Sequence, residues 1–216
     1  MKKLNLSEIR LFLGISEAEI DTVLTCLSAR YKTYQKGDYI FRMGELITSV
    51  GVITEGSVQI MKEDYWGERQ ILSSLSAGQI FGESYACVQG EPLMVSVVAT
   101  DKTEVLFLDM KKLLTVCSST CVFHSKLIQN MLWIIASKNL NFTHKIDHMS
   151  KKNIREKVLS YLYHESNKQG RRTIQIPFNR QQLADYLAVD RSALSAELSK
   201  MQKEGLISFH RNQFTI

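Results

Sequence analysis

The 216-residue chain contains only two prolines, four cysteines and five histidines. No stretch approaches the roughly 18 uncharged apolar residues that span a bilayer, so we expect no contact with a membrane. Glu8 and Arg10 stand where a signal peptide needs an apolar run, which predicts a cytoplasmic protein. The four cysteines are too few and too scattered for a disulfide scaffold, and this fits a reducing compartment.

Histidine does not occur before His124, which argues against a β-roll enzyme of the cupin type because such enzymes need clustered His and Glu metal ligands. No Ser-His-Asp or Cys-His constellation can be assigned from spacing, so we expect no enzyme, no catalytic residue and no cofactor. Cys117 and Cys121 have the spacing of packing residues at a helix start. His144 and His148 lie four apart on one helix, where a metal pair is an alternative to solvated side chains. We expect His124 at the surface and no metal site.

Charge is distributed unevenly along the chain. Residues 1–118 contain 12 Lys+Arg and 15 Asp+Glu, a net charge of −3, whereas residues 119–216 contain 15 and 7, a net charge of +8. A basic module at the C-terminal end is typical of proteins that bind a polyanion. The alternative on charge alone is a solvated, lysine-rich surface.

Glycine is also concentrated in one region, because eight of the 11 glycines lie between Gly37 and Gly90. Short runs rich in β-branched and aromatic residues separate them, which predicts an antiparallel sandwich or barrel. Before this region, Ser16 and Glu19 form a capping box that predicts a helix to about Leu27. The expected strands are Tyr39 to Phe41, Val50 to Ile53, Ser57 to Met61, Arg69 to Leu72, Val95 to Ala99 and Glu104 to Leu108.

A long helical segment begins at about Ser119, with no glycine or proline until Gly170. Apolar residues follow a heptad spacing along it, with one polar position, and predict a two-stranded coiled coil between two copies of the chain. A second apolar stripe of Leu127, Met131 and Ile134 would face the chain's own barrel. The alternative is a helix buried within one subunit. The expected dimer interface is Ile128, Leu132, Ile135, Asn139, Phe142 and Ile146, continued by Met149.

The apolar seam gives way to polar and basic residues at 147–153, where we place a hinge. Further on, Asn179 and Asp190 are good N-caps for two short helices, around a small core of leucines with Ala184 at their close approach. This pattern is typical of a helix-turn-helix, whose second helix enters the major groove of DNA. Two short strands around His210-Arg211-Asn212 predict a hairpin wing after it.

With these motifs in place, the sequence resembles the cyclic-AMP receptor/Fnr (Crp/Fnr) family of bacterial transcription regulators over essentially its whole length. The resemblance implies an α+β fold: an N-terminal antiparallel β-roll (a double-stranded β-helix), a long dimerisation helix and a C-terminal winged helix-turn-helix. We therefore expect a sensor domain at 1–118, the dimerisation helix and hinge at 119–149, and a DNA-binding domain at 150–216. The resembling blocks are Lys36 to Phe41, Gly56 to Val58, Gly78 to Glu83 and Arg191 to Ile207.

The resemblance also implies roles for residues of the helix-turn-helix and its wing. Arg180 corresponds to a phosphate-contacting position, which holds register without reading sequence. Many members of the family have arginine where this chain has Ala196, and glycine at the turn position that Ala188 occupies, where a left-handed backbone costs about 1 kcal/mol. Lys203 is a further candidate for a backbone contact. The expected DNA-binding residues are Arg180, Gln181, Arg191, Ser192, Ser195, Lys200, His210 and Arg211.

In cyclic-nucleotide-binding relatives, a Gly-Glu pair leads through a short helix to an Arg-Ser pair that holds the cyclic phosphate. Gly82 and Glu83 are present here, but Leu93 and Met94 replace the Arg-Ser pair. Without a guanidinium group, a buried phosphodiester charge would be unpaired, so we expect an apolar or aromatic effector other than cyclic AMP. The expected lining residues are Gly82, Glu83, Ser84, Tyr85, Leu93, Met94, Asn139, Phe142 and Thr143.

The sequence thus predicts a homodimer that reads an inverted repeat in double-stranded DNA with two recognition helices roughly 34–36 Å apart. RNA polymerase is a further candidate partner, and a small-molecule effector would shift the orientation of the sensor and DNA-binding domains. The alternatives are a cyclic-nucleotide-responsive regulator, a redox sensor that uses Cys117 and Cys121, and a pocket filled by side chains. A nucleotide-binding regulatory subunit would leave the helix-turn-helix unexplained.

Overall fold

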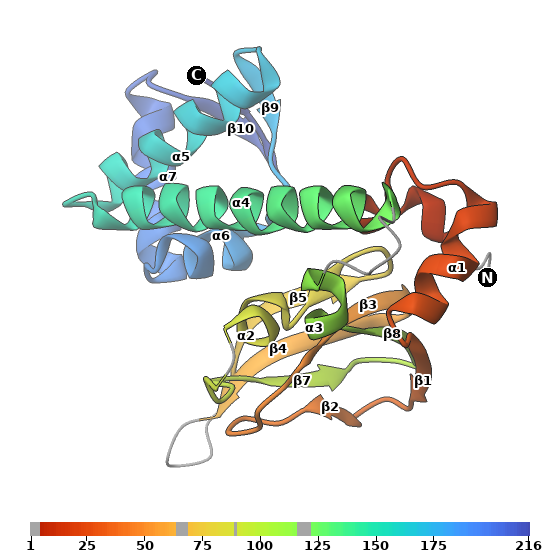
Figure 1. Cartoon of the computed structure of the whole chain (residues 1–216). Coiled ribbons are helices and arrows are strands. Elements are labelled where there is room, and N and C mark those ends of the chain that lie inside the picture. Colours follow the sequence, from red (N-terminus) through yellow and green to blue (C-terminus); the bar gives the residue numbers. More distant parts are fainter. Residues whose placement is uncertain (1–4, 64–68, 89, 116–121) are drawn as a thin grey trace. The chain divides into compact units, whose positions relative to one another are not determined.

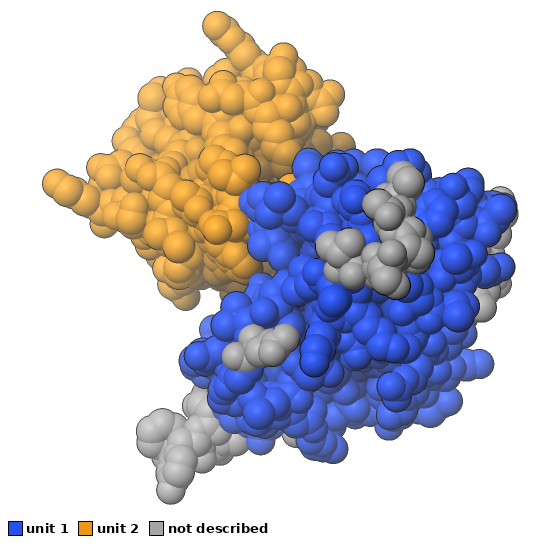
Figure 2. Space-filling model, in the orientation of Figure 1, with its two compact units in different colours: residues 1–136 blue, residues 137–216 orange. Residues whose placement is uncertain are grey.

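The computed structural model describes residues 5–63, 69–88, 90–115 and 122–216 (Figure 1). The expected helix start at Ser119 and the cysteines Cys117 and Cys121 lie outside these residues. Two compact units divide the chain, Met1–Ala136 and Ser137–Ile216, and they are shown in separate colours in Figure 2. Within the described residues, no helix is long and apolar enough to cross a membrane.

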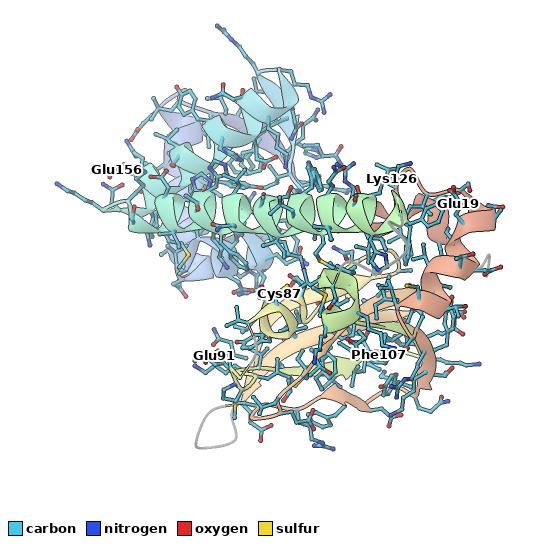
Figure 3. The ribbon with its side chains drawn as sticks, in the orientation of Figure 1. Glu19, Cys87, Glu91, Phe107, Lys126 and Glu156 are labelled. Carbon is cyan, nitrogen blue, oxygen red and sulfur yellow. The ribbon has the colours of Figure 1, made fainter. Side chains whose placement is uncertain are left out.

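Unit 1 begins with short helices. Two 3-10 turns, η1 (Leu6–Glu8) and η2 (Arg10–Phe12), precede helix α1 (Glu17–Cys26). The expected capping box is present, because the Glu19 carboxylate accepts hydrogen bonds from the backbone N–H of Ser16 at 2.8 Å and from its hydroxyl at 2.6 Å (Figure 3). These hydrogen bonds lower the pKa of Glu19. The predicted helix therefore starts where the sequence indicated.

Eight strands of unit 1 form two antiparallel four-stranded sheets, as a β-roll requires. One sheet has the order β1-β8-β3-β6 and the other β2-β7-β4-β5. The short helices α2 (Glu83–Cys87) and α3 (Met110–Leu114) follow β6 and β8. The strands are β1 (Arg30–Tyr34), β2 (Tyr39–Phe41), β3 (Ser49–Glu55), β4 (Ser57–Glu63), β5 (Arg69–Ser76), β6 (Ile80–Phe81), β7 (Ser96–Ala99) and β8 (Thr103–Asp109).

Strand β8 shows how the core of unit 1 is divided. Val105 and Phe107, the latter labelled in Figure 3, pack into the cluster between the two sheets. Leu106 and Leu108 pack into the cluster under the helices. Successive side chains of a strand point to opposite faces, so one strand serves both cores. Its four central residues, 105–108, are all apolar for this reason.

Gly51 is required by a close approach inside the first sheet. It pairs with Phe81 across β3 and β6, and an added Cβ would lie 2.3 Å from Cζ of the Phe81 ring. The aromatic ring therefore covers the backbone directly, which only glycine permits at this distance.

Helix α4 (Val122–Ser150) begins in unit 1 and ends in unit 2. In unit 1, Leu127, Met131 and Ile134 are buried in the core with the β-roll, as the second apolar stripe predicted. The Asn130 amide donates hydrogen bonds to the carbonyl oxygens of Leu11 at 3.0 Å and Leu13 at 2.9 Å, and so holds the N-terminal turns against the helix.

Unit 2 is a winged helix-turn-helix, with helices α5 (Ile154–Gln169), α6 (Arg180–Leu187) and α7 (Arg191–Lys203). Strands β9 (Thr173–Gln175), β10 (Ser208–His210) and β11 (Gln213–Thr215) form an antiparallel sheet in the order β10-β11-β9. Asn179 and Asp190 cap α6 and α7 as expected, by accepting from the N–H groups of Gln182 and Ala193 at 2.9 Å. The leucines between these helices are buried in one core.

Two turns of the winged helix-turn-helix add detail to the expectation from the sequence. Ala188 has φ 51° and ψ 60°, so the turn is left-handed without glycine. His210 pairs with Gln213 at the end of the hairpin, so the wing turn is only Arg211-Asn212 and His210 is a strand residue. A two-residue connection leaves Arg211 with φ 53°, a left-handed value that suits such a turn.

Candidate functional site

Helix α7 presents one polar face and buries the other. Leu194, Leu198 and Met201 are fully buried, while Arg191 and Ser192 are exposed in the first turn. Ser195 is half-buried, and its hydroxyl donates to the Arg191 carbonyl at 2.9 Å. The early part of α7 thus offers a guanidinium and two hydroxyl groups to a ligand, as expected of a recognition helix.

The capping residue Asp190 adds a negative charge to this face. Its carboxylate accepts from the Ser192 hydroxyl at 2.5 Å and from the Ala193 N–H. These hydrogen bonds lower the pKa of Asp190. The carboxylate orients Ser192, so that the serine oxygen still accepts a hydrogen bond while its proton is already used.

Arg180 lies at the start of α6 and is partly buried against the wing. Its guanidinium carbon lies 4.9 Å from the ring centroid of Phe209 and 5.5 Å from that of Phe214. One Nη donates to the Arg211 carbonyl at 3.4 Å, and burial lowers the pKa of Arg180. Because a guanidinium has five N–H donors, most remain available after this contact. The expected phosphate-contacting residue is therefore held in place before any ligand arrives.

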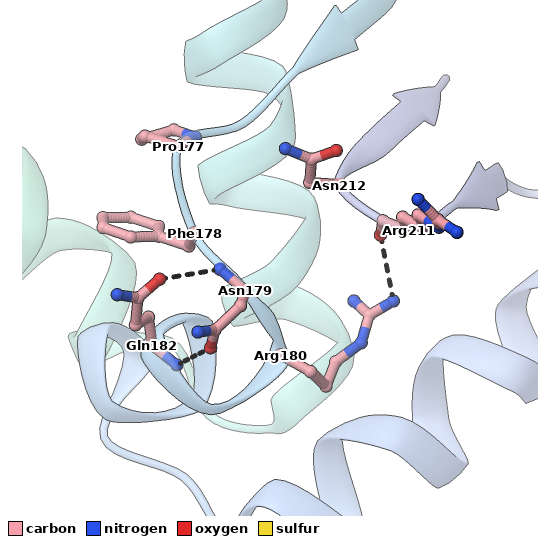
Figure 4. Close-up of a pocket in the computed structure, with 7 residues that line it drawn as sticks. All are labelled: Pro177, Phe178, Asn179, Arg180, Gln182, Arg211 and Asn212. Carbon is pink, nitrogen blue, oxygen red and sulfur yellow. Dashed lines mark hydrogen bonds between the residues drawn. The ribbon is translucent and has the colours of Figure 1, made fainter.

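A pocket lies between the N-terminus of α6 and the wing turn (Figure 4). Two arginines and the first backbone N–H groups of a helix make it suited to an anion. Gln181 lies just outside, exposed, and donates to Asp185 at 2.8 Å. The pocket is lined by Pro177, Phe178, Asn179, Arg180, Gln182, Arg211 and Asn212.

The remaining basic residues of the expected site are on the surface. Lys200 and Lys203 are exposed on the later turns of α7, and His210 and Arg211 are exposed on the wing. The structure thus brings the expected residues of α6, α7 and the wing together in one unit.

The sequence did not single out Arg155 on α5, which positions α7. Its guanidinium lies 2.6 Å from a carboxylate oxygen of Glu197 and 2.8 Å from one of Glu204. Both acids belong to the C-terminal part of α7 and its cap, and Arg155 lowers the pKa of Glu204. The ion pairs neutralise the two acidic residues in the later part of α7 and at its C-cap. These ion pairs could not be predicted from the sequence, because the partners are 42 and 49 residues apart and no local pattern relates them.

The expected dimer seam lies open along α4. Leu132, Phe142 and Ile146 are 65%, 64% and 67% exposed, Asn139 is exposed, and Ile128 and Ile135 are half-buried. Such a stripe of apolar side chains at heptad spacing is what a coiled-coil partner would cover.

The expected effector residues fall in both units. Gly82 caps α2 with φ 80°, and Glu83 is buried beneath it, with Ser84 exposed and Tyr85 half-buried on the same helix. The Tyr85 hydroxyl accepts from the Met94 N–H at 3.4 Å. Asn139, Phe142 and Thr143 are exposed and belong to unit 2.

Leu93 and Met94, the expected apolar pair, differ in burial. Leu93 is 3% exposed, whereas Met94 is 62% exposed. Both precede strand β7, and their contact with a ligand stays a prediction.

The expected exposure of His124 and of His148 is wrong. His124 is buried, with Nε2 3.8 Å from Sγ of Cys26, and is not a surface residue. His148 is buried rather than solvated. Both lie on faces of α4 that pack against other helices. In the part of the chain that the structure describes, no group of three His, Cys, Asp or Glu side chains has the arrangement of a metal site.

Comparison with known proteins matches the β-rich part of the chain and the helix-turn-helix to two separate family models. A family model of the cyclic nucleotide-binding domain matches residues 31–120, and one of the Crp-like helix-turn-helix domain matches residues 156–216. The cyclic AMP receptor protein of Thermus thermophilus is 32% identical, over 45% of this chain and 44% of that protein. The electron transport regulator A of Shewanella oneidensis is 25% identical, over 82% of this chain and 71% of that protein.

Solved structures show the same fold at low identity. The catabolite activator protein of Thermus thermophilus has a TM-score of 0.57 at 23% identity, covering 96% of this chain and 93% of that one. The c-di-GMP responsive global regulator CLP of Xanthomonas campestris has a TM-score of 0.60 at 16% identity, covering 93% and 99%. With a β-roll, a long helix and a winged helix-turn-helix in this order, the chain belongs to the Crp/Fnr family of transcription regulators.

Proposed function

We propose that the protein is a homodimer that binds an inverted repeat in double-stranded DNA through residues of α6, α7 and the wing. The observation that carries this proposal is the gathering of Arg180, Arg191 and Arg211 in one unit, around capped helix N-termini. Guanidinium groups pair with phosphate oxygens and with guanine O6 and N7. Three such groups and the polar start of α7 provide both kinds of contact.

The roles divide by burial and by position. Arg180 and Arg211 line the pocket at the start of α6, so we assign them to backbone phosphates. Arg191 and Ser192 are exposed at the start of α7, so we assign them to base edges. Ser195, Gln181, Lys200 and His210 flank these groups as further contacts.

The exposed stripe of α4 supports the dimer. Its heptad spacing matches a two-stranded coiled coil, and Asn139 at one seam position would fix the register. A two-fold dimer places two copies of α7 on one side of a duplex and reads two half-sites. RNA polymerase is a further proposed partner of the DNA-bound dimer.

The experiment is selection of DNA fragments from a random pool by the full chain, followed by titration of the best fragment. Arg191→Ala should weaken binding by about 1–3 kcal/mol and relax the preference at one position of each half-site. Arg172→Ala is the matched control, because the register of β9 with β11 places Arg172 at the end of the hairpin away from Arg211. Equal losses in the two variants, or no selected inverted repeat, would contradict the proposal.

We further propose that the effector held by unit 1 is not cyclic AMP. Leu93 is buried near the cassette formed by Gly82 and Glu83, and no guanidinium replaces the missing arginine at this position. Burial of a phosphodiester there would be unfavourable, because its negative charge would be unpaired. The proposed ligand is an apolar or aromatic small molecule, bordered within unit 1 by the residues of α2 and by Leu93.

A cyclic nucleotide remains the second candidate, because the family model that matches residues 31–120 is that of a cyclic nucleotide-binding domain. Calorimetry of the full chain with cyclic AMP distinguishes the two. We expect no heat of binding at micromolar concentrations. Micromolar binding that Glu83→Ala weakens would establish the cyclic nucleotide instead.

A further inference from the structure

Three histidines join the end of α4 to α5 inside unit 2. The ring centroids of His144 and His164 are 4.2 Å apart, and those of His148 and His164 are 5.5 Å apart. His148 is only 2% exposed. We call His144, His148 and His164 the histidine cluster. Three imidazoles in contact cannot all carry a charge without strong repulsion.

A hydrogen-bond chain favours one neutral tautomer of His148. The Ser160 hydroxyl donates to an oxygen of Asp147 at 3.3 Å, and its oxygen lies 2.8 Å from Nδ1 of His148. With its proton directed at Asp147, the hydroxyl oxygen is left to accept from Nδ1–H. In this tautomer Nε2 is the bare nitrogen.

That bare nitrogen has nowhere to place a second proton. Within the described residues, Nε2 of His148 and the hydroxyl of Tyr161 are buried and have no hydrogen-bond partner. The two rings are 5.8 Å apart at their centroids, edge to face. Protonation at Nε2 would create a buried N–H with a positive charge and no carboxylate to accept it, which is costly.

Charged groups surround the cluster on each packed element. Helix α4 contributes Asp147 and Lys145, and Lys151 directly follows it. Helix α5 contributes Glu165 and Lys168, and α6 contributes the ring of Tyr186. Burial and the neighbouring histidines lower the pKa of His148 and His164. Asp147 opposes this at His148, and Glu165 opposes it at His164. Asp147 already pairs with Lys151 at 2.8 Å and is largely exposed, which limits its effect.

We propose that the histidine cluster is a proton-sensitive contact, which packs the end of α4 against α5 while its histidines are neutral and loosens when they are protonated. The proposal rests on contacts within unit 2 alone. Its regulatory consequence rests on the proposed function, since α4 carries the proposed dimer seam and α5 belongs to the DNA-binding domain. Acidification would then weaken the packing between the end of α4, the helix that carries the proposed dimer seam, and α5 of the DNA-binding domain.

The sign follows from proton binding. A histidine whose pKa is lower in the packed state binds more protons when the contact opens, so opening is favoured as the pH falls below the ordinary histidine pKa. Above that pH the contact has its full stability. Each such histidine raises the opening equilibrium constant by up to about tenfold per pH unit in this window.

The test is hydrogen exchange of the full chain between pH 7.5 and 5.5, corrected for the intrinsic pH dependence, with peptides that cover residues 144–165. We expect the opening equilibrium constant of this segment to rise at least tenfold on acidification in the wild type. His148→Asn keeps a donor toward Ser160 but cannot be protonated, and it should reduce the rise to the share that His164 contributes. His210→Asn, at the exposed wing, is the matched control and should leave the rise unchanged.

Exchange in this segment that does not change with pH, or an equal response in His148→Asn and the wild type, would overturn the proposal. A second measurement avoids dependence on the variant: titration of the five histidine rings of the wild type by NMR. We expect the rings of His148 and His164 to titrate below the ordinary histidine pKa, and titration of both at the ordinary value would also overturn it. Neither measurement involves DNA, so failure of the proposed function leaves their outcome unaffected.

Discussion

The two units of the chain bury their apolar residues in different ways. In unit 1, β8 supplies one core between two sheets and a second core under the helices. In unit 2, α5, α6 and α7 share a single core with a small sheet. The charge differs as well, since residues 137–216 contain 14 Lys+Arg and 7 Asp+Glu. Local motifs identify the helical unit readily, whereas the pairing of strands in the β-roll spans long separations.

The largest expected effect tests whether the two cores are independent. Leu198→Ala removes a fully buried side chain from unit 2, and Leu106→Ala removes one from unit 1. Each should cost about 2–5 kcal/mol in the free energy of unfolding of its own unit. Hydrogen exchange of peptides from both units measures this. If Leu198→Ala weakens protection in the β-roll as much as in the reader, the two units do not unfold separately.

A second substitution sharpens the comparison along α4, which both units share. Phe142→Asp places a carboxylate in the proposed seam and should weaken dimerisation by on the order of 3 kcal/mol, because the charge would be buried without a partner. Leu140→Asp is the control, since Leu140 is similarly exposed but lies outside the heptad seam. Sedimentation velocity over a range of concentrations reports the two. A monomeric wild type would contradict the seam itself.

The smallest effect concerns the ion pairs that hold α7 in unit 2. Arg155→Ala should lower the free energy of unfolding only modestly, because its partners Glu197 and Glu204 are partly exposed. DNA affinity should fall several-fold, since two carboxylates lose their counter-charge. Lys168→Ala, whose nearest carboxylate oxygen on Glu165 is 4.0 Å away, should change stability by less than about 0.5 kcal/mol. Denaturant unfolding compares the variants, and equal losses would mean that Arg155 has no special role.

Much of the fold could be predicted because its signals are local. The caps Ser16, Asn179 and Asp190, the strands around the glycines and the buried stripe of α4 were all confirmed. Strand β1 was not expected, because Arg30–Tyr34 has one buried residue and an edge strand carries little apolar pattern. The DNA-contacting, seam and effector residues remain predictions, because their ligands decide them.

The sequence by itself determined the order of the modules and the helix ends, since their signals depend on residues within a few positions of one another. It also determined the charge asymmetry, which depends on composition alone. Tertiary structure alone decided the burial of Leu93 and the exposure of Met94, the pairing of Arg155 with α7 and the histidine cluster. These features join residues on different elements, or depend on which face a packed element buries. Their energies come from burial and contact, which no local pattern encodes.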